Sequence, residues 1–420
     1  MISRGETDMA QAGQTGQRLR LAYFSPLPPA PTGIADYSRE LLPYLSRSAD
    51  VTVFIPDPAE RPEGITHNIR IRPISDYAPL RMEFDLPLYQ MGNSFQHEFV
   101  YQQALRYPGV VVLHEYYLHH LLVAMMGSEE RYGAYVRELG YAFGQPGVEM
   151  AWQIRYGQVP YPLFSLPLNN RLLDRSLGLL VHSKTTASRL RQQAGRPEIG
   201  IVPQLMTPRA GESQRQKLPA SLGITPETVI FASIGQVTAS KRLDLALRSF
   251  ARLLDNYPES RYLIVGQEGA GSDLDDLIES LGLSQVVYRT GYVAGLNAFG
   301  DWTSTADIII NLRQPTLGET SAAVLRAMAA SRPTIVFNHG WYSELPEETC
   351  TQVPLQDEDA LYEAMITLVR SPQRRRAIGQ RAADYVKNEL APETCAAQYL
   401  TFLNGLLMNL NRQYSEVDSV

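Results

Sequence analysis

The chain has 420 residues, of which 44% are hydrophobic and 20% are charged, so it has the composition of an ordinary globular protein and enough length for two domains. This composition excludes fibrous and disordered chains, and the formal net charge of −6 at pH 7 argues against nucleic acid as a partner. The chain has no run of 18 apolar residues and no signal peptide, and its two cysteines, Cys350 and Cys395, fit a reducing compartment, so we expect a cytoplasmic protein with at most peripheral membrane association.

Short apolar segments alternate with helical segments through the first half of the chain. After a polar tail over residues 1–17, which we expect to be disordered, apolar runs predict strands at residues 21–24, 51–55, 86–89, 110–113 and 179–181. Short, fully apolar strands separated by helices are typical of a parallel sheet covered on both faces. The pattern predicts an α/β domain over residues 18–202.

A polar stretch over residues 203–218 interrupts this alternation and predicts a hinge. The alternation then resumes, with strands expected at residues 229–232, 262–265, 286–288, 308–310 and 334–336. We therefore predict a second α/β domain over residues 219–390, followed by a C-terminal segment over residues 391–420. In two doubly wound sheets, ligands bind at the carboxyl ends of the strands, so the site is expected between the domains.

The first loop, residues 26–34, places Gly33 immediately before a predicted helix. Free backbone amides and the positive end of the helix dipole favour an anion there, although a simple turn would use the same glycine. The loop lacks the G-x-G-x-x-G spacing of dinucleotide sites, and no P-loop motif occurs anywhere in the chain. Nicotinamide-dependent dehydrogenases and P-loop nucleotidases are therefore disfavoured.

His114 and Glu115 directly follow the predicted strand at residues 110–113. A zinc protease helix needs a second histidine four residues after the first, but position 118 is leucine and the next histidines are His119 and His120. The spacing therefore excludes that zinc motif. His114 fits either a substrate contact or a hydrogen-bonded structural residue, whereas the other two histidines are expected on a helix surface or in packing contacts.

A rare lysine lies in the loop after the first strand of the second domain. That strand ends at Gly235, the loop contains Gln236, and Lys241 and Arg242 precede a predicted helix. The chain has only three other lysines, Lys184, Lys217 and Lys387. Two adjacent cations at this position suit a diphosphate leaving group, and a solvated surface pair is the alternative.

Residues 314–330 combine a glycine, a carboxylate and two hydroxyl groups with an alanine-rich helical segment. Gly318, Glu319, Thr320 and Ser321 are expected to open the helix, whose first amides have no partner within the helix and can bind phosphate oxygens. Alternatively, Glu319 complements the helix dipole and a hydroxyl caps the helix.

Taken in chain order, these motifs, together with Val265-Gly266 and Pro333-Thr334-Ile335-Val336, resemble the retaining, nucleotide-sugar-dependent glycosyltransferases of family four. The resemblance covers about residues 20–400 and is strongest in the second half. It implies the GT-B fold, in which two Rossmann-like domains face each other across a cleft and the last helix, here residues 391–420, returns to the first domain. It also implies an acceptor-binding first domain, a donor-binding second domain, no catalytic metal and no other cofactor.

The same resemblance assigns roles to individual residues. It implies that Lys241 contacts the donor diphosphate, that Gly33 lies near the phosphates, and that His114 lies beside the transferred sugar. The catalytic set is then Lys241, Glu319 and His114, and the donor-binding set is Gly33, Gly235, Gln236, Arg242, Gly266, Tyr292, Val293, Gly318, Thr320, Ser321 and Arg326.

The chain departs from the family pattern at two places in the predicted donor site. The usual arginine before the lysine is Gln236, for which Arg242 would have to substitute, and the two glutamates of the family motif align with Gly318 and Arg326. Glu319 is seven residues before Arg326, about 20° short of two helical turns, so both are expected on one side of a helix. We expect Glu319 to support the donor hexose and Arg326 to contact the nucleotide.

The resemblance therefore predicts transfer of a hexose from a nucleoside diphosphate sugar to a hydroxyl group of a saccharide or lipid-linked acceptor, with retention of configuration. Such a reaction belongs to glycan, glycolipid or exopolysaccharide synthesis. Two alternatives remain open: a sugar-nucleotide epimerase or hydrolase with the same architecture, and a non-catalytic partner subunit that only binds a sugar nucleotide.

Overall fold

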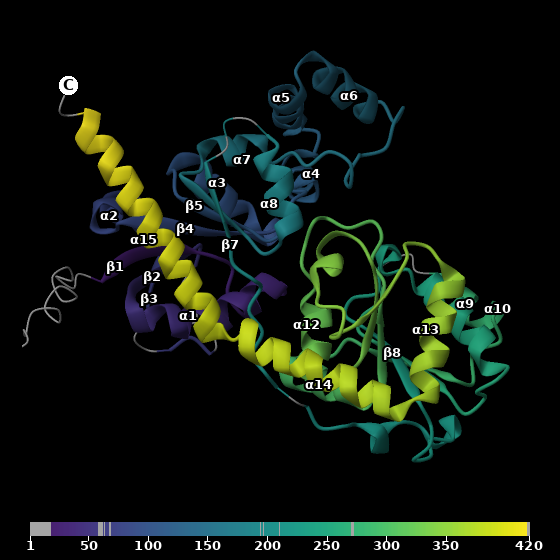
Figure 1. Cartoon of the computed structure of the whole chain (residues 1–420). Coiled ribbons are helices and arrows are strands. Elements are labelled where there is room, and N and C mark those ends of the chain that lie inside the picture. Colours follow the sequence, from purple (N-terminus) through teal and green to yellow (C-terminus); the bar gives the residue numbers. More distant parts are fainter. Residues whose placement is uncertain are drawn as a thin grey trace, which may run out of the picture.

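The computed structural model describes residues 18–57, 62, 64–66, 69–193, 195, 197–209, 211–269 and 273–417. These residues form two α/β units, each built on a parallel sheet (Figure 1). The predicted tail over residues 1–17 lies outside the described residues. The α/β class predicted from the alternation of apolar segments is confirmed.

The first sheet has seven strands in the order β3-β2-β1-β4-β5-β6-β7, all paired in parallel. The strands are β1 (Leu19–Phe24), β2 (Ala49–Ile55), β3 (Arg70–Pro73), β4 (Leu86–Met91), β5 (Val110–Leu113), β6 (Gly178–Val181) and β7 (Glu198–Ile201). The five predicted strands form the interior of this sheet, whereas the two edge strands, β3 and β7, were not predicted.

The second sheet has six strands in the order β10-β9-β8-β11-β12-β13, again all parallel. Its strands are β8 (Ile230–Ile234), β9 (Arg261–Val265), β10 (Val287–Gly291), β11 (Ile308–Asn311), β12 (Thr334–Phe337) and β13 (Thr351–Val353). The five predicted strands are present, and the edge strand β13 is additional.

Helices cover the sheets and connect their strands. Around the first sheet lie α1 (Gly33–Ser48), α2 (Tyr77–Leu80), α3 (Glu98–Arg106), α4 (His119–Met126), α5 (Tyr132–Phe143), α6 (Gln145–Arg155), α7 (Asn170–Arg175) and α8 (Lys184–Arg191). The later helices are α9 (Leu243–Leu254), α10 (Leu274–Ser280), α11 (Leu296–Thr305), α12 (Ala322–Ala329), α13 (Glu358–Arg370), α14 (Pro372–Glu389) and α15 (Pro392–Val417). Short 3-10 turns are η1 (Ile74–Asp76), η2 (Arg81–Glu83), η3 (Phe95–His97), η4 (Arg215–Lys217), η5 (Ala220–Leu222), η6 (Ala239–Lys241) and η7 (Gly340–Glu344).

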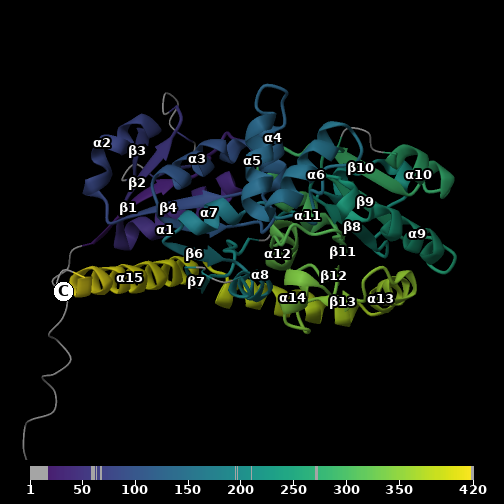
Figure 2. The same cartoon turned by 90° about the horizontal axis from the view of Figure 1, so that it is seen from above.

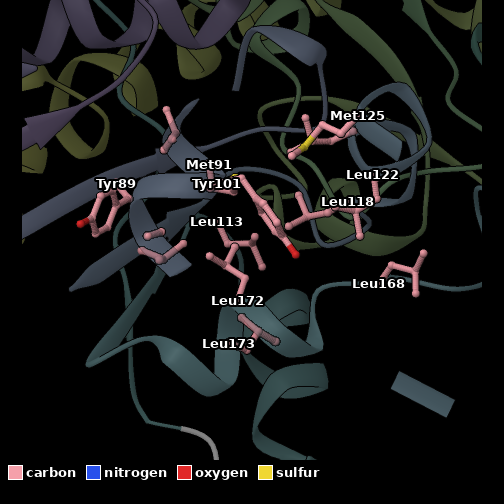
Figure 3. Close-up of a cluster of buried hydrophobic side chains, with 14 of the residues drawn as sticks. Tyr89, Met91, Tyr101, Leu113, Leu118, Leu122, Met125, Leu168, Leu172 and Leu173 are labelled. Carbon is pink, nitrogen blue, oxygen red and sulfur yellow. The ribbon is translucent and has the colours of Figure 1, made fainter. Parts of the chain in front are cut away.

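The first sheet is buried on both faces, which explains why its interior strands are continuously apolar. Along β1, Ala22 and Phe24 belong to one buried cluster, whereas Leu21 and Tyr23 belong to another on the opposite face. Figure 3 shows part of the first cluster, where side chains from β4, β5, α3, α4 and α7 meet. This layering holds the carboxyl ends of the strands, and the loops that follow them, in fixed positions.

The last helix, α15, crosses from the second unit back to the first, as Figures 1 and 2 show in yellow. Its buried residues Tyr399, Leu403 and Leu406 pack into the cluster that also contains Leu41 and Leu45 of α1. The hydroxyls of Tyr37 and Tyr399 are hydrogen-bonded at 2.7 Å. The expected return of the C-terminal helix to the first domain is confirmed.

Two segments cross between the units side by side, since the amide of Met206 donates to the carbonyl of Leu390 at 2.9 Å. Further along the first crossing, the amides of Gly211 and Gln214 donate to hydroxyls of Ser304 and Thr305 at the end of α11. Part of the predicted hinge over residues 203–218 is therefore docked on the second unit. Within the described part of the chain, no helix is both long and apolar enough to cross a bilayer.

Candidate functional site

The two units meet through loops that follow strands of both sheets. The amides of Tyr116 and Tyr117, after β5, donate to the carbonyl of Leu317 at 2.9 and 3.1 Å, and the Thr186 hydroxyl donates to the carbonyl of Gly318 at 3.1 Å. Gly318 has φ +78°, and a Cβ at this position would lie 2.6 Å from the Cβ of Tyr116. The glycine therefore allows the loop after β11 to approach the first unit.

Lys241 is buried in the loop after β8, with a side chain directed at the strand end. Its Nζ donates to the carbonyl of Ile234, and burial, with a contribution from Arg313, lowers its pKa to about 7. A Cβ at Gly235 would lie 2.6 Å from this Nζ and 3.9 Å from the Cβ of Ala323 in α12. Lys241 and the start of α12 are therefore close neighbours at the boundary between the units.

The other predicted glycines shape the chain around this point. Gly235 and Gly266 have φ of +92° and +136°, and a Cβ at Gly266 would lie 2.4 Å from the carbonyl oxygen of Gly235. Only glycine allows the turns after β8 and β9 to approach this closely. Gly33 opens α1 behind the capping hydroxyl of Thr32, and nothing lies within 4 Å of the Cβ position at Gly33.

Arg313, which the sequence analysis missed, lies beside Lys241. It follows β11, its Nη1 donates to the Ser240 hydroxyl at 3.1 Å, and its Nε lies 3.3 Å from Oε1 of Glu319. Burial lowers its pKa, but the neighbouring Tyr342 hydroxyl and the carboxyl groups of Glu319 and Glu115 outweigh burial and raise it. Arg313 could have been found by the same pattern that identified Lys241, namely a positively charged residue shortly after an apolar strand.

Glu319 does not belong to a helix. Its Oε2 accepts hydrogen bonds from the Thr316 hydroxyl at 2.7 Å and the Leu317 amide at 2.6 Å, so the carboxylate folds back on its own loop. Helix α12 begins at Ala322, with Ser321 as the cap that accepts from the Val324 amide. The expectation that Glu319 and Arg326 share one face of a helix is wrong, because the backbone of the N-cap residue Ser321 is extended (φ −105°, ψ 100°) and the helix begins only after it.

Both arginines that were predicted for the donor site are paired with carboxylates. Arg242 makes two hydrogen bonds to Asp244, at 3.0 and 2.9 Å. Arg326 lies 3.7 Å from Glu40 of α1, so it connects the two units. The charges of both guanidinium groups are balanced within the chain.

The remaining predicted donor residues have different surroundings. The Thr320 hydroxyl donates to the side chain of Gln204 in the crossing segment. Gln236 is exposed, and Tyr292 is 72% exposed, while Val293 packs against the core of the second unit. The structure thus brings Thr320 to the boundary between the units and leaves Tyr292 on the surface.

His114 is buried, and both of its ring nitrogens are hydrogen-bonded within the first unit. His182 must donate its Nδ1 proton to the Val202 carbonyl, so its Nε2 accepts from Nδ1 of His114. Nε2 of His114 then has to accept from the Gln90 side chain, which requires the amide nitrogen of Gln90 to face it. Burial, the first cause, and nearby His182 and His97 keep the pKa of His114 far below its usual value, so the ring is neutral.

Glu115 contributes a second carboxyl group to the boundary. Its Oε2 accepts from the Asn93 amide at 2.5 Å, and burial together with Glu319 raises its pKa to about 7. Glu115, Glu319, Lys241 and Arg313 thus form one mixed-charge cluster contributed by both units. Among the residues that the structure describes, no group of three or more histidine, cysteine, aspartate or glutamate side chains is arranged to hold a metal ion.

A cavity of about 440 Å³ lies beside the first loop of the first unit. Its walls are mainly apolar, and the residues that define its character are Pro26, Pro28, Pro29, Phe99 and the polar Asp57. Because β1 and β2 both end here, the cavity lies at the carboxyl edge of the first sheet, the expected position of a ligand site in such folds.

Comparison with known families identifies the second half of the chain. Residues 214–385 match the family described as glycosyl transferases group 1. This part of the chain is a group 1 glycosyltransferase domain. Lys241, Arg313 and Glu319 all lie within the residues that match this family.

Curated relatives of the chain are glycosyltransferases. It is 23% identical over 203 residues to alpha-monoglucosyldiacylglycerol synthase of Acholeplasma laidlawii, which covers 48% of this chain and 50% of the relative. It is 30% identical over 184 residues to D-inositol 3-phosphate glycosyltransferase of Kineococcus radiotolerans, which covers 39% of this chain and 41% of the relative. The chain thus spans about half the length of these relatives or less.

Solved structures extend the likeness to nearly the whole chain. Sucrose-phosphate synthase of Thermosynechococcus elongatus has a TM-score of 0.64 at 17% identity and covers 93% of this chain and 100% of its own. HepE of Anabaena in complex with UDP has a TM-score of 0.63 at 15% identity and covers 92% of this chain and 100% of its own. The predicted GT-B fold of two Rossmann-like domains is confirmed.

Proposed function

We propose that the chain transfers a hexose from a nucleoside diphosphate sugar to a hydroxyl group of an acceptor, with retention of anomeric configuration and without a catalytic metal. The observation that carries this proposal is the position of buried Lys241 against the start of α12, at the boundary of two GT-B domains. The names of the relatives, a glucosyldiacylglycerol synthase and inositol phosphate glycosyltransferases, support sugar transfer. A structural neighbour solved with UDP-glucose supports a nucleotide sugar as the donor.

Lys241 is suited to stabilise the leaving diphosphate. Its pKa of about 7 leaves the amine about half neutral at neutral pH, since burial disfavours the ammonium form. A diphosphate bound beside Nζ would restore the charge, because a nearby anion favours the protonated amine. The first amides of α12, which have no acceptor within the helix, would bind further phosphate oxygens.

The transfer would proceed on one face of the sugar. The bond between the anomeric carbon and the diphosphate oxygen breaks, the acceptor oxygen bonds to the anomeric carbon, and the acceptor proton passes to the departing phosphate oxygen. In this scheme the protein orients the reactants and stabilises charge. His114 supports the site as a neutral, fixed residue, because both its ring nitrogens already have partners.

The acceptor is expected on the first domain, at the cavity beside the proline-rich loop. Its mainly apolar wall fits the face of a sugar ring or the apolar part of a lipid-linked acceptor, and Asp57 and Gln96 are the polar residues of its lining. We therefore propose a saccharide or lipid-linked acceptor and no more than peripheral contact with a membrane.

The test is a transfer assay with UDP, GDP and ADP sugars against saccharide and lipid acceptors in the presence of EDTA. We expect nucleoside diphosphate release that depends on the acceptor, and a product that NMR shows to have the anomeric configuration of the donor. Lys241→Ala should lower kcat on the order of a hundredfold, as for loss of one donor that stabilises a developing anion. Lys387→Ala, an exposed lysine of α14, is the matched control and should behave as wild type.

Three results would contradict the proposal in different ways. Release of nucleoside diphosphate without any acceptor would indicate a hydrolase. A changed sugar that remains attached to its nucleotide would indicate an epimerase. Binding of a sugar nucleotide with no turnover against any acceptor would indicate a non-catalytic partner subunit.

A further inference from the structure

The site of the proposed transfer has a deficit of free positive charge. A diphosphate carries at least two negative charges, and Gln236, exposed in the loop before Lys241, supplies no positive charge. Arg242 is already held by two hydrogen bonds to Asp244, and Arg326 faces Glu40 of the other domain. Of the cations predicted for the donor site, Lys241 alone has no carboxylate partner in the described part of the chain.

Arg313 lies where a second cation is needed. The amide of Gln314 donates to the carbonyl of Ser240 at 2.7 Å, and Nη1 of Arg313 donates to the Ser240 hydroxyl. These two bonds fix the loop of Arg313 to the residue directly before Lys241. Arg313 is close enough to Lys241 to contribute to the lowered pKa of the lysine, so two like charges are held together in a partly buried place.

Glu319 is an ion-pair partner of Arg313, but it leaves part of the hydrogen-bonding capacity of the guanidinium unused. Nε of Arg313 and Oε1 of Glu319 are 3.3 Å apart, yet neither atom has a hydrogen-bond partner among the described residues. The other oxygen of Glu319 is used by Thr316 and Leu317. A planar guanidinium with an unsatisfied N–H beside a buried lysine is suited to an anion that can accept several hydrogen bonds at once.

We propose that Arg313 binds the pyrophosphate of the donor together with Lys241 and so supplies the positive charge that Gln236 lacks. This inference rests on the proposed function. Arg313 reaches the site from the end of β11, whereas Lys241 reaches it from the end of β8, its neighbour in the sheet. The two cations would thus hold the pyrophosphate from adjacent strands.

Isothermal titration tests the proposal with inorganic pyrophosphate, with UDP, GDP and ADP, and with the corresponding nucleosides. Arg313→Ala should weaken binding of pyrophosphate and of the preferred nucleoside diphosphate about 10- to 100-fold, the usual range for loss of charge-assisted hydrogen bonds, and leave nucleoside binding unchanged. Arg313→Lys should recover part of the loss, because lysine keeps the charge but not the fork geometry. Arg252→Ala, which removes a surface arginine of α9 paired with Asp359, should bind as wild type.

Glu319→Gln distinguishes direct binding of the pyrophosphate by Arg313 from a role in which Arg313 only positions Glu319. Glutamine keeps an acceptor for Thr316 and Leu317 but removes the negative charge beside Arg313, so pyrophosphate should bind as tightly as to wild type or tighter. The inference is overturned if Glu319→Gln reproduces the loss seen with Arg313→Ala, or if Arg313→Ala weakens nucleoside binding equally. It is also overturned if Arg313→Ala binds the diphosphate normally, which leaves the proposed function standing. If wild type binds no diphosphate, the proposed function falls and the role of Arg313 falls with it.

Discussion

Glu115 is a carboxyl group of the first domain that faces charges of the second. Burial and the negative Glu319 raise its pKa from 4.5 to about 7. Between these two pH values the folded chain binds more protons at this site than the unfolded chain, so the contribution of Glu115 to the free energy of unfolding falls as pH rises through this range. Above about pH 7 the full cost of the buried charge is present.

Glu115→Gln should therefore stabilise the protein at alkaline pH. At pH 8 we expect its free energy of unfolding in urea to exceed that of wild type by no more than about 3 kcal/mol, and at pH 5 the difference should fall below about 1 kcal/mol. Glu130→Gln, an exposed residue near the start of α5, is the control and should show no such pH dependence. Equal gains at pH 5 and pH 8 would contradict the assignment of the effect to ionisation.

The sequence predicted part of the charge cluster and missed the rest for physical reasons. Lys241 was found because a rare lysine followed an apolar strand. Arg313 follows a strand in the same way, but it directly precedes residues 314–330, whose glycine, carboxylate and hydroxyl groups are the stronger signal. Residue spacing placed Glu319 in the helix, because the extended backbone of Ser321, after which α12 begins, cannot be read from spacing alone.

At the scale of elements, interior strands were predictable and most edge strands were not. Strands β3, β7 and β13, with the sequences RIRP, EIGI and TQV, lie at edges of the two sheets. An edge strand has one neighbour and is only partly covered, so it does not need the continuous apolar run that marks a buried parallel strand. The signal used for the other strands was therefore absent.

Helix α15 should be a main source of stability for the first domain, although it follows the second in the chain. Leu403 is fully buried in the cluster shared with α1. Leu403→Ala should lower the free energy of unfolding by about 2–5 kcal/mol, because it leaves a cavity at this contact. Met408→Ala, on the same helix but 58% exposed, should change it by no more than about 0.5 kcal/mol. Chemical denaturation followed by circular dichroism measures both, and equal effects would mean that α15 does not pack as described.

At the scale of the whole molecule, a carboxylate of the second domain binds the start of a helix of the first. The amides of Lys184 and Thr185, at the start of α8, donate to the two oxygens of Glu344 at 2.8 and 2.7 Å. A carboxylate is favoured there because the helix N-terminus has free amides and a positive dipole end. Such pairs join residues far apart in the sequence, with no periodicity between them, so neither this contact nor the Glu40–Arg326 pair was predicted.

Glu344→Ala should loosen this contact. We expect the amides in a peptide that contains Lys184 and Thr185 to exchange with deuterium about five- to tenfold faster, as for loss of a helix cap worth about 1 kcal/mol. Glu347→Ala, which removes an exposed glutamate nearby, should leave this exchange unchanged. Undisturbed protection in the Glu344 variant would show that the carboxylate does not hold α8.

Gly318 has no side chain beyond a hydrogen atom, and this determines how closely the two domains can approach each other. A methyl group there would clash with Tyr116 and keep the two domains further apart. Because Arg313 is five residues upstream on the same loop, a larger residue at position 318 would alter the spacing between the domains and would also displace the cluster of Arg313 and Glu319. The tolerance for change at position 318 therefore depends on the fit of one domain against the other.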